Sequence, residues 1–294
     1  MSVGGNRKNV RMRVIDTGVE LREAVAGARA VGKRIGFVPT MGALHEGHLS
    51  LVRRAREEND FLVISIFVNT TQFGPNEDLD SYPRDLEGDT AKSREIGVDV
   101  IFAPTAAEMY PEGFSTRICQ TGLADVLEGA HRPGHFDGVC TVCAKLFNLV
   151  QAGKAYFGRK DYQQSLIVRR MVRDLDFPLE IRVLPTVREE DGLAMSSRNQ
   201  YLNPEERRQA PSLYRALKRA REAFHAGERK ASTLRGMMEE EIRQAPLAKI
   251  DYVAIADAES LASLDTIETD AVALLAVRIG GTRLIDNMPL PMHT

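Results

Sequence analysis

The sequence lacks several features that would point to particular classes of protein. It has no strong charge excess, because 39 Lys and Arg face 41 Asp and Glu and leave a net charge of −2. This balance argues against a nucleic acid as the main partner. No apolar run approaches about 18–20 residues, so we expect no segment that spans a membrane. Residues 1–13 are polar and basic without the apolar centre of a secretory signal, and we expect a frayed leader there.

Cysteine is also scarce. The chain has three cysteines, an odd number without the spacing of a disulfide framework. Cys140 and Cys143 have CxxC spacing, which would suit a redox pair or zinc ligands. They lie in an apolar, helix-like run at residues 138–150, so we interpret them as small core residues. This cysteine usage predicts a cytoplasmic protein.

What is present is the composition of a globular protein. Hydrophobic residues make up 43% of the 294 positions and charged residues 27%, which is enough to bury a full core. The length fits one large or two ordinary domains. We find no internal repeat and no low-complexity segment.

Strand-like and helix-like stretches alternate through the first two thirds of the chain. We expect helices at 19–31, 47 onward, 83–96, 138–151 and 161–175, and strands at 35–38, 61–68, 98–102, 116–120, 155–157 and 179–184. Alternation of this kind indicates βαβ units around a parallel, Rossmann-like sheet. In such sheets, ligands bind beyond the carboxyl ends of the strands.

The pattern changes near residue 185. We expect long helices at 204–226 and 232–244 and strands at 250–256, 271–279 and 282–285, the last two joined by a Gly-Gly hairpin turn. The sequence therefore predicts an α/β chain with a Rossmann-like domain at 1–186 and a smaller α+β domain at 187–294.

One stretch of the first domain indicates phosphate chemistry. An apolar strand at 35–38 is broken by Pro39 and Gly42, and a helix follows from Gly47. The N-terminus of that helix would present free N–H groups and a positive dipole end, which favour a phosphate. His45 and His48 stand at this helix start, three apart, whereas a zinc-protease helix needs histidines four apart. Two solvated histidines are the simpler alternative. Imidazoles that stabilise negative charge on a phosphate are the functional one.

A second polar signature lies about 150 residues downstream. Met195 is followed by Ser196, Ser197 and Arg198, and two hydroxyls beside a guanidinium suit phosphate oxygens. Ser-Ser-Arg is also common on protein surfaces. Its place on a loop between the two predicted domains favours a functional role, because such loops can close over a substrate.

These motifs together resemble a known family. HxGH after a strand and a glycine turn, followed later by MSSR, is similar to the nucleotidylyltransferase superfamily that includes class I aminoacyl-tRNA synthetases. The resemblance narrows to pantothenate synthetases, the pantoate–β-alanine ligases, on VPTMGALHEGH (38–48), SIFVN (65–69), QFG (72–74), YPR (82–84), RPGHF (132–136), KLFN (145–148), FGRKDYQQ (157–164), SSRN (196–199) and LIDN (284–287). One departure is Thr70, where the family pattern leads us to expect proline and where the change could loosen the following loop.

The resemblance implies a reaction. It implies that the pantoate carboxylate attacks the α-phosphorus of ATP, used with Mg²⁺, to give pantoyl adenylate and pyrophosphate. The amine of β-alanine then attacks the adenylate and releases AMP and pantothenate. The resemblance further implies a homodimer whose partners are small molecules, with no nucleic acid and no membrane. Catalysis of the first step would consist mostly of positioning and charge stabilisation.

The resemblance also implies roles for individual residues. The expected catalytic groups are His48 as the favoured proton donor, His45, Lys160, Ser196, Ser197 and Arg198. The expected ATP-binding residues are Pro39, Thr40, Met41, Gly42, Ala43, Leu44, His45, Glu46, Gly47, His48, Gly158, Arg159, Lys160, Asp161, Val187, Met195, Ser196, Ser197 and Arg198. The expected pantoate-binding residues are Gln72, Gln164 and, more weakly, Asn69 and Arg132, with Gln72 also meeting β-alanine. No residue is assigned to a metal.

Two alternatives stay open at this point. The first is another nucleotidylyltransferase, such as a tRNA-charging enzyme or a cytidylyltransferase; the mildly acidic balance and the small second domain count against tRNA. The second is a nucleotide-sensing module without activity. The presence of His48, Lys160 and Arg198 argues against that module.

Overall fold

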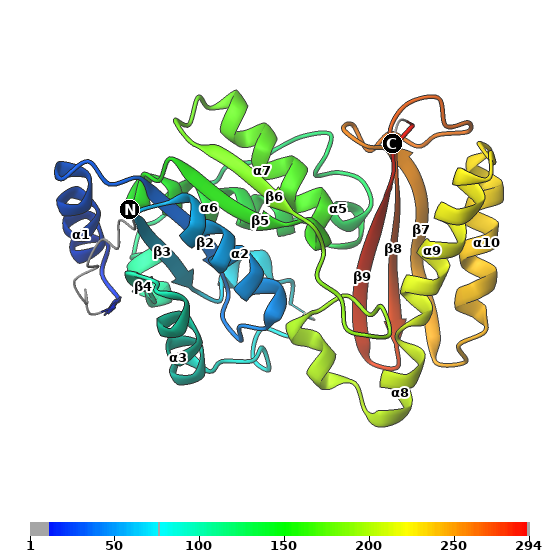
Figure 1. The fold of residues 1–294 in the computed structure, drawn as a ribbon, viewed down its shortest axis with the longest axis horizontal. Coiled ribbons are helices and arrows are strands. Elements are labelled where there is room, and N and C mark those ends of the chain that lie inside the picture. The colour runs from blue at the N-terminus through cyan, green and yellow to red at the C-terminus, as the bar shows by residue number, and fades with distance from the viewer. Residues whose placement is uncertain (1–11, 76, 293–294) are drawn as a thin grey trace, which may run out of the picture.

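The computed structural model describes residues 12–75 and 77–292. The predicted leader falls outside these residues as far as residue 11. Two sheets organise the chain, one parallel and one antiparallel, and they lie side by side along the longest axis (Figure 1). The prediction of an α/β Rossmann-like part followed by a smaller α+β part is confirmed. No helix in the described ranges combines the length and the apolar character needed to cross a membrane.

The first sheet is parallel throughout and has the order β1-β4-β3-β2-β5-β6. Its strands are β1 (Arg13–Ile15), β2 (Ile35–Thr40), β3 (Phe61–Ile66), β4 (Val100–Phe102), β5 (Lys154–Gly158) and β6 (Glu180–Leu184). The order reverses between β2 and β5, whose carboxyl ends therefore border a crevice. In doubly wound sheets this crevice is the usual ligand site.

Helices cover both faces of this sheet because alternate strand residues are apolar on both sides. Phe37 and Val63 face the core beneath α1 (Gly18–Ala30), α6 (His135–Val150) and α7 (Tyr162–Asp174). Val38 and Leu62 face the core beneath α2 (Glu46–Glu58) and α3 (Leu86–Ile96). The connections contain the short helices α4 (Ala106–Met109) and α5 (Glu128–His131), and the 3₁₀ turns η1 (Thr70–Gln72), η2 (Arg159–Asp161) and η3 (Ser197–Tyr201).

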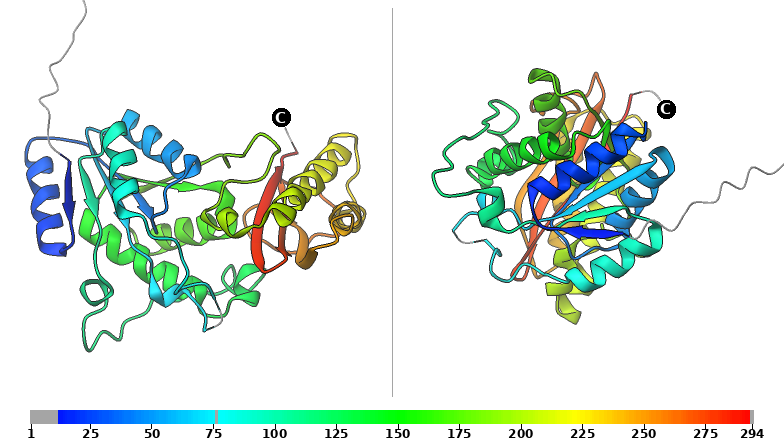
Figure 2. Two further views of the ribbon diagram at one scale, coloured as in Figure 1. Left: turned by 90° about the horizontal axis from the view of Figure 1, so that it is seen from below. Right: turned by 90° about the vertical axis from the view of Figure 1, so that its left-hand side faces the viewer.

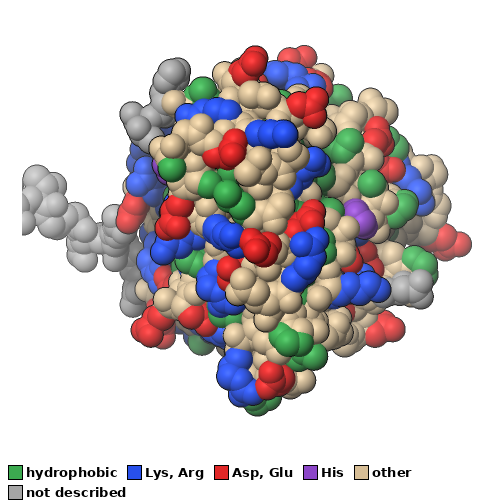
Figure 3. Space-filling view, turned by 90° about the vertical axis from the view of Figure 1, so that its right-hand side faces the viewer, with side chains coloured by type: hydrophobic (Ala, Val, Ile, Leu, Met, Phe, Trp, Pro, Cys, Tyr) green, Lys and Arg blue, Asp and Glu red, His purple; other side chains and the backbone are tan. Residues whose placement is uncertain are grey.

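The second sheet is antiparallel in the order β7-β8-β9. Its strands are β7 (Ala248–Asp257), β8 (Ala271–Ile279) and β9 (Thr282–Leu290), and its helices are α8 (Pro204–Gln209), α9 (Ser212–His225) and α10 (Ala231–Arg243). Ala273 and Leu275 pack beneath α9 and α10, whereas Leu274 joins the core that continues into the first part. The end of the molecule where these helices lie carries interspersed basic and acidic side chains (Figure 3).

A buried ion-pair network joins the two parts. The guanidinium of Arg283 on β9 binds both carboxylate oxygens of Glu128 on α5, at 2.7 and 2.8 Å, and also Asp251 on β7 at 2.7 Å. The left view of Figure 2 shows the same contact region from below, where green segments of the first part lie beside the red strand β9. The last strand of the first sheet ends at Leu184. The domain division after residue 186 stays a prediction.

Several local expectations were wrong, each for a physical reason. Residues 116–120 form no strand, because no neighbouring strand in the described chain pairs with their apolar and β-branched residues. The expected helix at 204–226 divides into α8 and α9, since Pro211 has no N–H to continue the helical ladder. The helix expected from residue 83 begins at Leu86 behind the N-cap Asp85. The three-residue edge strand β1 was missed. Cys140 and Cys143 are buried in α6, which confirms their interpretation as core residues.

Candidate active site

The glycine turn after β2 is fixed by a carboxylate from α3. Asp89, which is fully buried, accepts hydrogen bonds from the N–H groups of Ala43 at 2.8 Å and Leu44 at 2.7 Å. Gly42 has φ +88°, and a Cβ at this position would lie 2.9 Å from a methyl carbon of Ile66. The turn therefore needs glycine both for its backbone conformation and for its packing. Contacts within the chain therefore fix the position of the turn.

The two histidines cap the helix that follows this turn. His45 is the N-cap residue of α2, and its Nδ1 accepts from the N–H of Gly47 at 3.2 Å. Nδ1 of His48 accepts in turn from the N–H of His45 at 3.5 Å. An Nδ1 that accepts a hydrogen bond leaves the proton of the neutral ring on Nε2. Both rings are therefore held as Nε2–H donors, with their centroids 4.1 Å apart.

Burial keeps these rings neutral. Burial and the ammonium of Lys160 lower the pKa of His45 to about 4, and burial together with the His45 ring lowers the pKa of His48 to about 3. At neutral pH both imidazoles are uncharged hydrogen-bond donors. Such donors can stabilise charge that develops on a phosphate oxygen without first losing a proton.

The Ser-Ser-Arg loop lies against the histidine turn, although about 150 residues separate the two in sequence. The hydroxyl of Ser197 donates to the carbonyl of Ala43 at 3.3 Å. Nε and Nη2 of Arg198 bind the two oxygens of Asp78 at 2.9 and 2.8 Å, and its guanidinium lies 5.7 Å from the ring centre of Tyr82. Although burial lowers the pKa of Arg198, Asp78 outweighs it and raises that pKa above its ordinary value.

The loop after β3 presents one free amide. Oε1 of Gln72 accepts from Asn69 at 3.0 Å, while its Nε2 contacts only the sulfur of Met41, at 3.3 Å, among the described residues. A thioether is a weak acceptor, so these N–H groups are available to a ligand. The amide and carbonyl of Asn69, in contrast, are used by Gln72, Gly138, Thr71 and Tyr110. Asn69 therefore holds the loop, and Gln72 faces the cavity.

Arg132 is tied to its surroundings in a similar way. Its guanidinium binds both oxygens of Glu77, at 2.7 and 2.5 Å, and Nη1 donates to Nε2 of His135 at 3.1 Å. Nδ1 of His135 donates to the carbonyl of Gln72 at 2.8 Å. Burial and Arg132 lower the pKa of His135 to about 4, so this ring is neutral as well. The side chain of Gln164, on α7, makes no hydrogen bond to any described residue and is free to bind.

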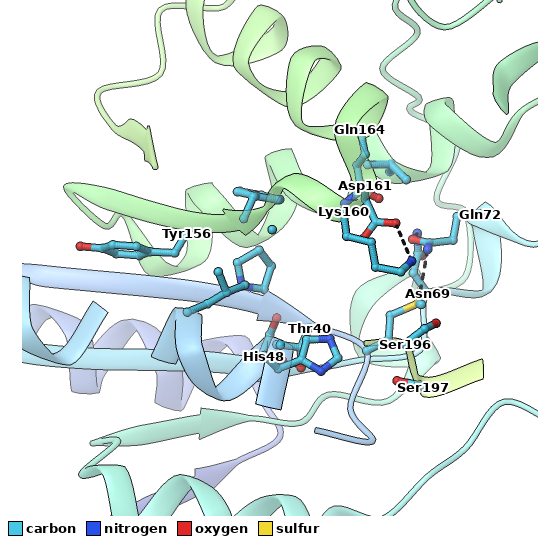
Figure 4. A pocket seen from close by; sticks show the side chains of 18 of the residues that line it. Thr40, His48, Asn69, Gln72, Tyr156, Lys160, Asp161, Gln164, Ser196 and Ser197 are labelled. Atoms are coloured by element: carbon cyan, nitrogen blue, oxygen red, sulfur yellow. Dashed lines mark hydrogen bonds and ion pairs between the residues drawn. The ribbon is translucent and has the colours of Figure 1, made fainter. Parts of the chain in front are cut away.

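The two histidines, Gln72, Arg132, Gln164 and the Ser-Ser-Arg loop line one cavity of about 220 Å³, partly open to solvent, at the crevice between β2 and β5. Figure 4 shows His48 and Thr40 on one side, Lys160, Asp161 and Gln164 on another, and Gln72, Asn69, Ser196 and Ser197 on a third. Of the predicted ligand-binding residues, the lining contains Pro39, Thr40, Met41, His45, Gly47, His48, Asn69, Gln72, Arg132, Gly158, Lys160, Asp161, Gln164, Val187, Met195, Ser196, Ser197 and Arg198.

The structure keeps a few predicted residues out of this lining. Gly42, Ala43 and Leu44 form the turn behind it. Glu46 is exposed and pairs with Arg53, and Arg159 borders a different surface hollow. The predicted roles of all site residues stay predictions. Thr70, which replaces the expected proline, begins η1 on the protein surface.

Sequence reasoning missed several residues that shape the site. Asp89 looked like an ordinary acidic position of a surface helix, and only the docking of α3 brings it to the turn. His135 was part of a quoted motif but received no role. The apolar floor, made by one face of α6, contains Val139, Val142 and Leu146. The helical spacing of that apolar face was the available signal.

Fold and site together define a class of protein. The sheet is Rossmann-like, two histidines cap the helix that starts where its strand order reverses, and a Ser-Ser-Arg loop faces them. These are the features of a nucleotidylyltransferase of the HxGH type. The family model for pantoate-beta-alanine ligase matches residues 13–289. The chain belongs to this family and is therefore an enzyme, a ligase of pantoate and β-alanine.

Relatives support this assignment over nearly the whole chain. Pantothenate synthetase from Moorella thermoacetica is 56% identical over 282 residues, which cover 96% of this chain and 100% of that protein. Pantothenate synthetase from Roseiflexus castenholzii is 58% identical and covers 94% of this chain and 98% of its own.

Solved structures agree. The crystal structure of pantothenate synthetase from Thermus thermophilus has a TM-score of 0.91 at 53% identity and covers 95% of this chain and 100% of that one. Pantoate-beta-alanine ligase from Francisella tularensis, described as complexed with beta-gamma ATP and beta-alanine, has a TM-score of 0.78 at 34% identity. It covers 95% of this chain and 97% of its own.

Proposed function

We propose that the cavity between β2 and β5 condenses pantoate with β-alanine at the expense of ATP, through a pantoyl adenylate. One observation carries the proposal: two neutral Nε2–H imidazoles, a Ser-Ser-Arg loop and two amides with free N–H groups line the same cavity. The imidazoles and the loop suit a polyphosphate, and the amides suit a small hydroxy acid. The related ligase from Francisella tularensis, described as complexed with beta-gamma ATP and beta-alanine, supports this choice of substrates.

In the first step, a carboxylate oxygen of pantoate attacks the α-phosphorus of ATP and pyrophosphate leaves. Negative charge shifts toward the leaving phosphates during this displacement. His48 and His45 donate hydrogen bonds from Nε2 to these oxygens, while Lys160, Ser196, Ser197 and Arg198 bind the triphosphate. Because burial keeps the two imidazoles neutral, they act by donating hydrogen bonds rather than as charged acids.

Pantoate lies between Gln72 and Gln164. Each side-chain amide offers two N–H donors and one acceptor oxygen, which matches a molecule with two hydroxyls and a carboxylate. Asn69 and Arg132 hold this pocket in shape more than they bind, since their polar atoms already have partners. We therefore propose that Asn69 and Arg132 support the pantoate pocket, whereas the family resemblance implied direct contacts with pantoate.

In the second step, the β-alanine amine attacks the acyl carbon of the adenylate. The new C–N bond forms, the C–O bond to the phosphate breaks, and AMP leaves with the electron pair. The amine proton passes to solvent. We place β-alanine beside Gln72, whose free N–H groups face the cavity. Adenylation is needed because a free carboxylate is a poor acylating agent.

The family membership supports further proposals about the enzyme as a whole. ATP enters as its Mg²⁺ complex, since Mg²⁺ keeps several waters and usually binds through substrate phosphates. Two copies form a homodimer, and the enzyme works in the cytoplasm. Residues 1–186 bind nucleotide and pantoate, and residues 187–294 serve as a lid that carries the Ser-Ser-Arg loop.

Isotope exchange tests the first step directly. With the purified full chain and Mg²⁺, labelled pyrophosphate is expected to enter ATP only when pantoate is present. AMP release is then measured with pantoate and β-alanine added separately and together, and only the pair should support turnover. Exchange that ignores pantoate, or AMP release driven by another acid, would instead indicate a different nucleotidylyltransferase. ATP binding without any exchange or AMP release would indicate a nucleotide sensor.

A further inference from the structure

Two polar residues of β9 lie buried at the contact between the two sheets. Asp286 and Asn287 are each only 3% exposed. They belong to the LIDN motif, yet neither contacts the main cavity, and the reaction described above uses neither. Both border a second, smaller cavity that also touches Lys160, Asp161 and Gln164. Asp286 and Asn287 therefore lie behind residues that line the main cavity.

Asn287 binds the backbone that presents Lys160. Its Nδ2 donates to the carbonyl of Arg159 at 2.9 Å and to the carbonyl of Lys160 at 2.8 Å. Only an NH₂ group can satisfy two carbonyls at once, which assigns the orientation of the amide. Neither Gly158 nor Asp161 supplies a side-chain cap at this turn or at the start of α7. The bond from β9 is thus the side-chain anchor of η2.

Asp286 reaches the other phosphate-binding segment. Its two oxygens bind the guanidinium of Arg188 at 2.6 and 2.9 Å, and Arg188 also donates to the carbonyl of Gly192. Arg188 pairs with Ala194 in an isolated bridge, just before Met195 and the Ser-Ser-Arg loop. One oxygen of Asp286 additionally accepts from the N–H of Asn287 at 2.7 Å. Two adjacent residues of one strand therefore hold both segments.

The Asn287 amide is buried for its contacts with the backbone of the neighbouring part. Its Nδ2 serves two carbonyls of η2, whereas its Oδ1 is buried without a hydrogen-bond partner among the described residues. Buried polar groups of this kind are expected near functional sites.

We propose that Asp286 and Asn287 are positioning residues for the adenylation step, with Asn287 acting through Lys160 and Asp286 through the Ser-Ser-Arg loop. This rests on the ATP-binding roles proposed above. Because β9 binds both segments, Lys160 and the Ser-Ser-Arg loop keep fixed positions relative to each other. A small misplacement of such groups is sufficient to lower a rate about 100-fold.

The test measures pantoate-dependent pyrophosphate exchange by Asn287→Ala. We expect its kcat/KM for ATP to fall about 10- to 100-fold, with the KM for β-alanine in the full reaction within about twofold of wild type. The decisive readout is a double-mutant cycle. If Asn287 acts through Lys160, adding Asn287→Ala to Lys160→Ala should reduce exchange by less than about threefold, because the group that it positions is already absent.

Tyr162→Phe is a matched control. It removes another hydrogen bond between the two parts, from the Tyr162 hydroxyl to the carbonyl of Ala258 at 2.8 Å, without touching the carbonyls at 159 and 160. Exchange by this variant should stay within about twofold of wild type. Asp286→Asn, which keeps the side-chain size but weakens the pair with Arg188, should also raise the KM for ATP. It provides a second route should Asn287→Ala fail to fold.

The outcomes separate the two proposals. No exchange by the wild-type chain overturns the proposed function itself. Wild-type exchange with normal ATP kinetics in Asn287→Ala and Asp286→Asn overturns the positioning role alone. Equal losses from Asn287→Ala with and without Lys160, or an equal loss from Tyr162→Phe, would show a general effect of domain contact and would also overturn it.

Discussion

The histidine turn and the Ser-Ser-Arg loop face the same cavity but are held in different ways. The turn at residues 41–48 is fixed from within its own domain by backbone hydrogen bonds to the buried Asp89 and by the mutual capping of two histidines. The loop is held across the cavity by one hydroxyl and by the ion pair between Arg198 and Asp78, whose side chains are 28% and 23% exposed.

This difference indicates separate roles for the two halves of the site, the histidine turn and the Ser-Ser-Arg loop. Backbone bonds to a buried carboxylate keep the turn in one geometry whether or not a ligand is bound, which is the preorganisation that charge stabilisation needs. The Arg198–Asp78 pair joins two side chains, and a polyphosphate carries more negative charge than one carboxylate, so it can replace Asp78 on the guanidinium. We infer that the turn is the preorganised half, whereas in the loop, which Asp286 anchors at its base through Arg188, the Arg198 guanidinium is the group that exchanges its partner.

The largest effect is expected where a preorganised donor is removed. His48→Ala should lower kcat for exchange about 10²–10³-fold, or roughly 2.7–4 kcal/mol, because an Nε2–H donor to the developing charge is lost. His48→Gln, which keeps a donor and an acceptor, should recover part of the rate. His225→Ala is the control, since this histidine is exposed at the end of α9. Steady-state kinetics near wild type for His48→Ala would remove His48 from the chemistry.

A somewhat smaller effect, on the free energy of unfolding, is expected when the carboxylate beneath the turn is removed. Asp89→Ala leaves two backbone N–H groups without their acceptor, so the free energy of unfolding should fall by roughly 2–3 kcal/mol in a urea titration. Asp85→Ala removes only the N-cap of the same helix and should cost about 1 kcal/mol. If the two variants were equally stable, Asp89 would be an ordinary helix acid and the turn would have another support.

The contrast between the halves also explains what sequence could predict. The strand, glycine turn and helix of the first half follow from local signals, because Pro39, Gly42 and the apolar spacing after Gly47 determine them within about one dozen residues. Their partner Asp89 carries no local mark. Its role depends on how α3 docks, 45 residues away in sequence from Leu44.

The second half depended on the family resemblance, not on local pattern. Ser-Ser-Arg has no structure of its own to predict, and its contact with Ala43 arises only when two sheets are brought together. The same holds for Asn287, which lies beyond the strand predicted at 282–285 and received no role although it belongs to the LIDN motif. Residues 116–120 show the opposite error. Their composition favours a strand, but the described chain offers no partner strand to them, and they form none.

The smallest predicted effect tests whether the loop is exchangeable. Asp78→Asn should lower the KM for ATP about threefold, because the triphosphate no longer competes with a charged carboxylate for Arg198. Glu77→Gln is the matched control, since the neighbouring carboxylate binds Arg132 instead and should leave the KM for ATP unchanged. ATP titrations at fixed ionic strength measure both variants. A rise in the KM of Asp78→Asn would mean that Asp78 aligns Arg198 for the phosphates, and the loop would then be as preorganised as the histidine turn.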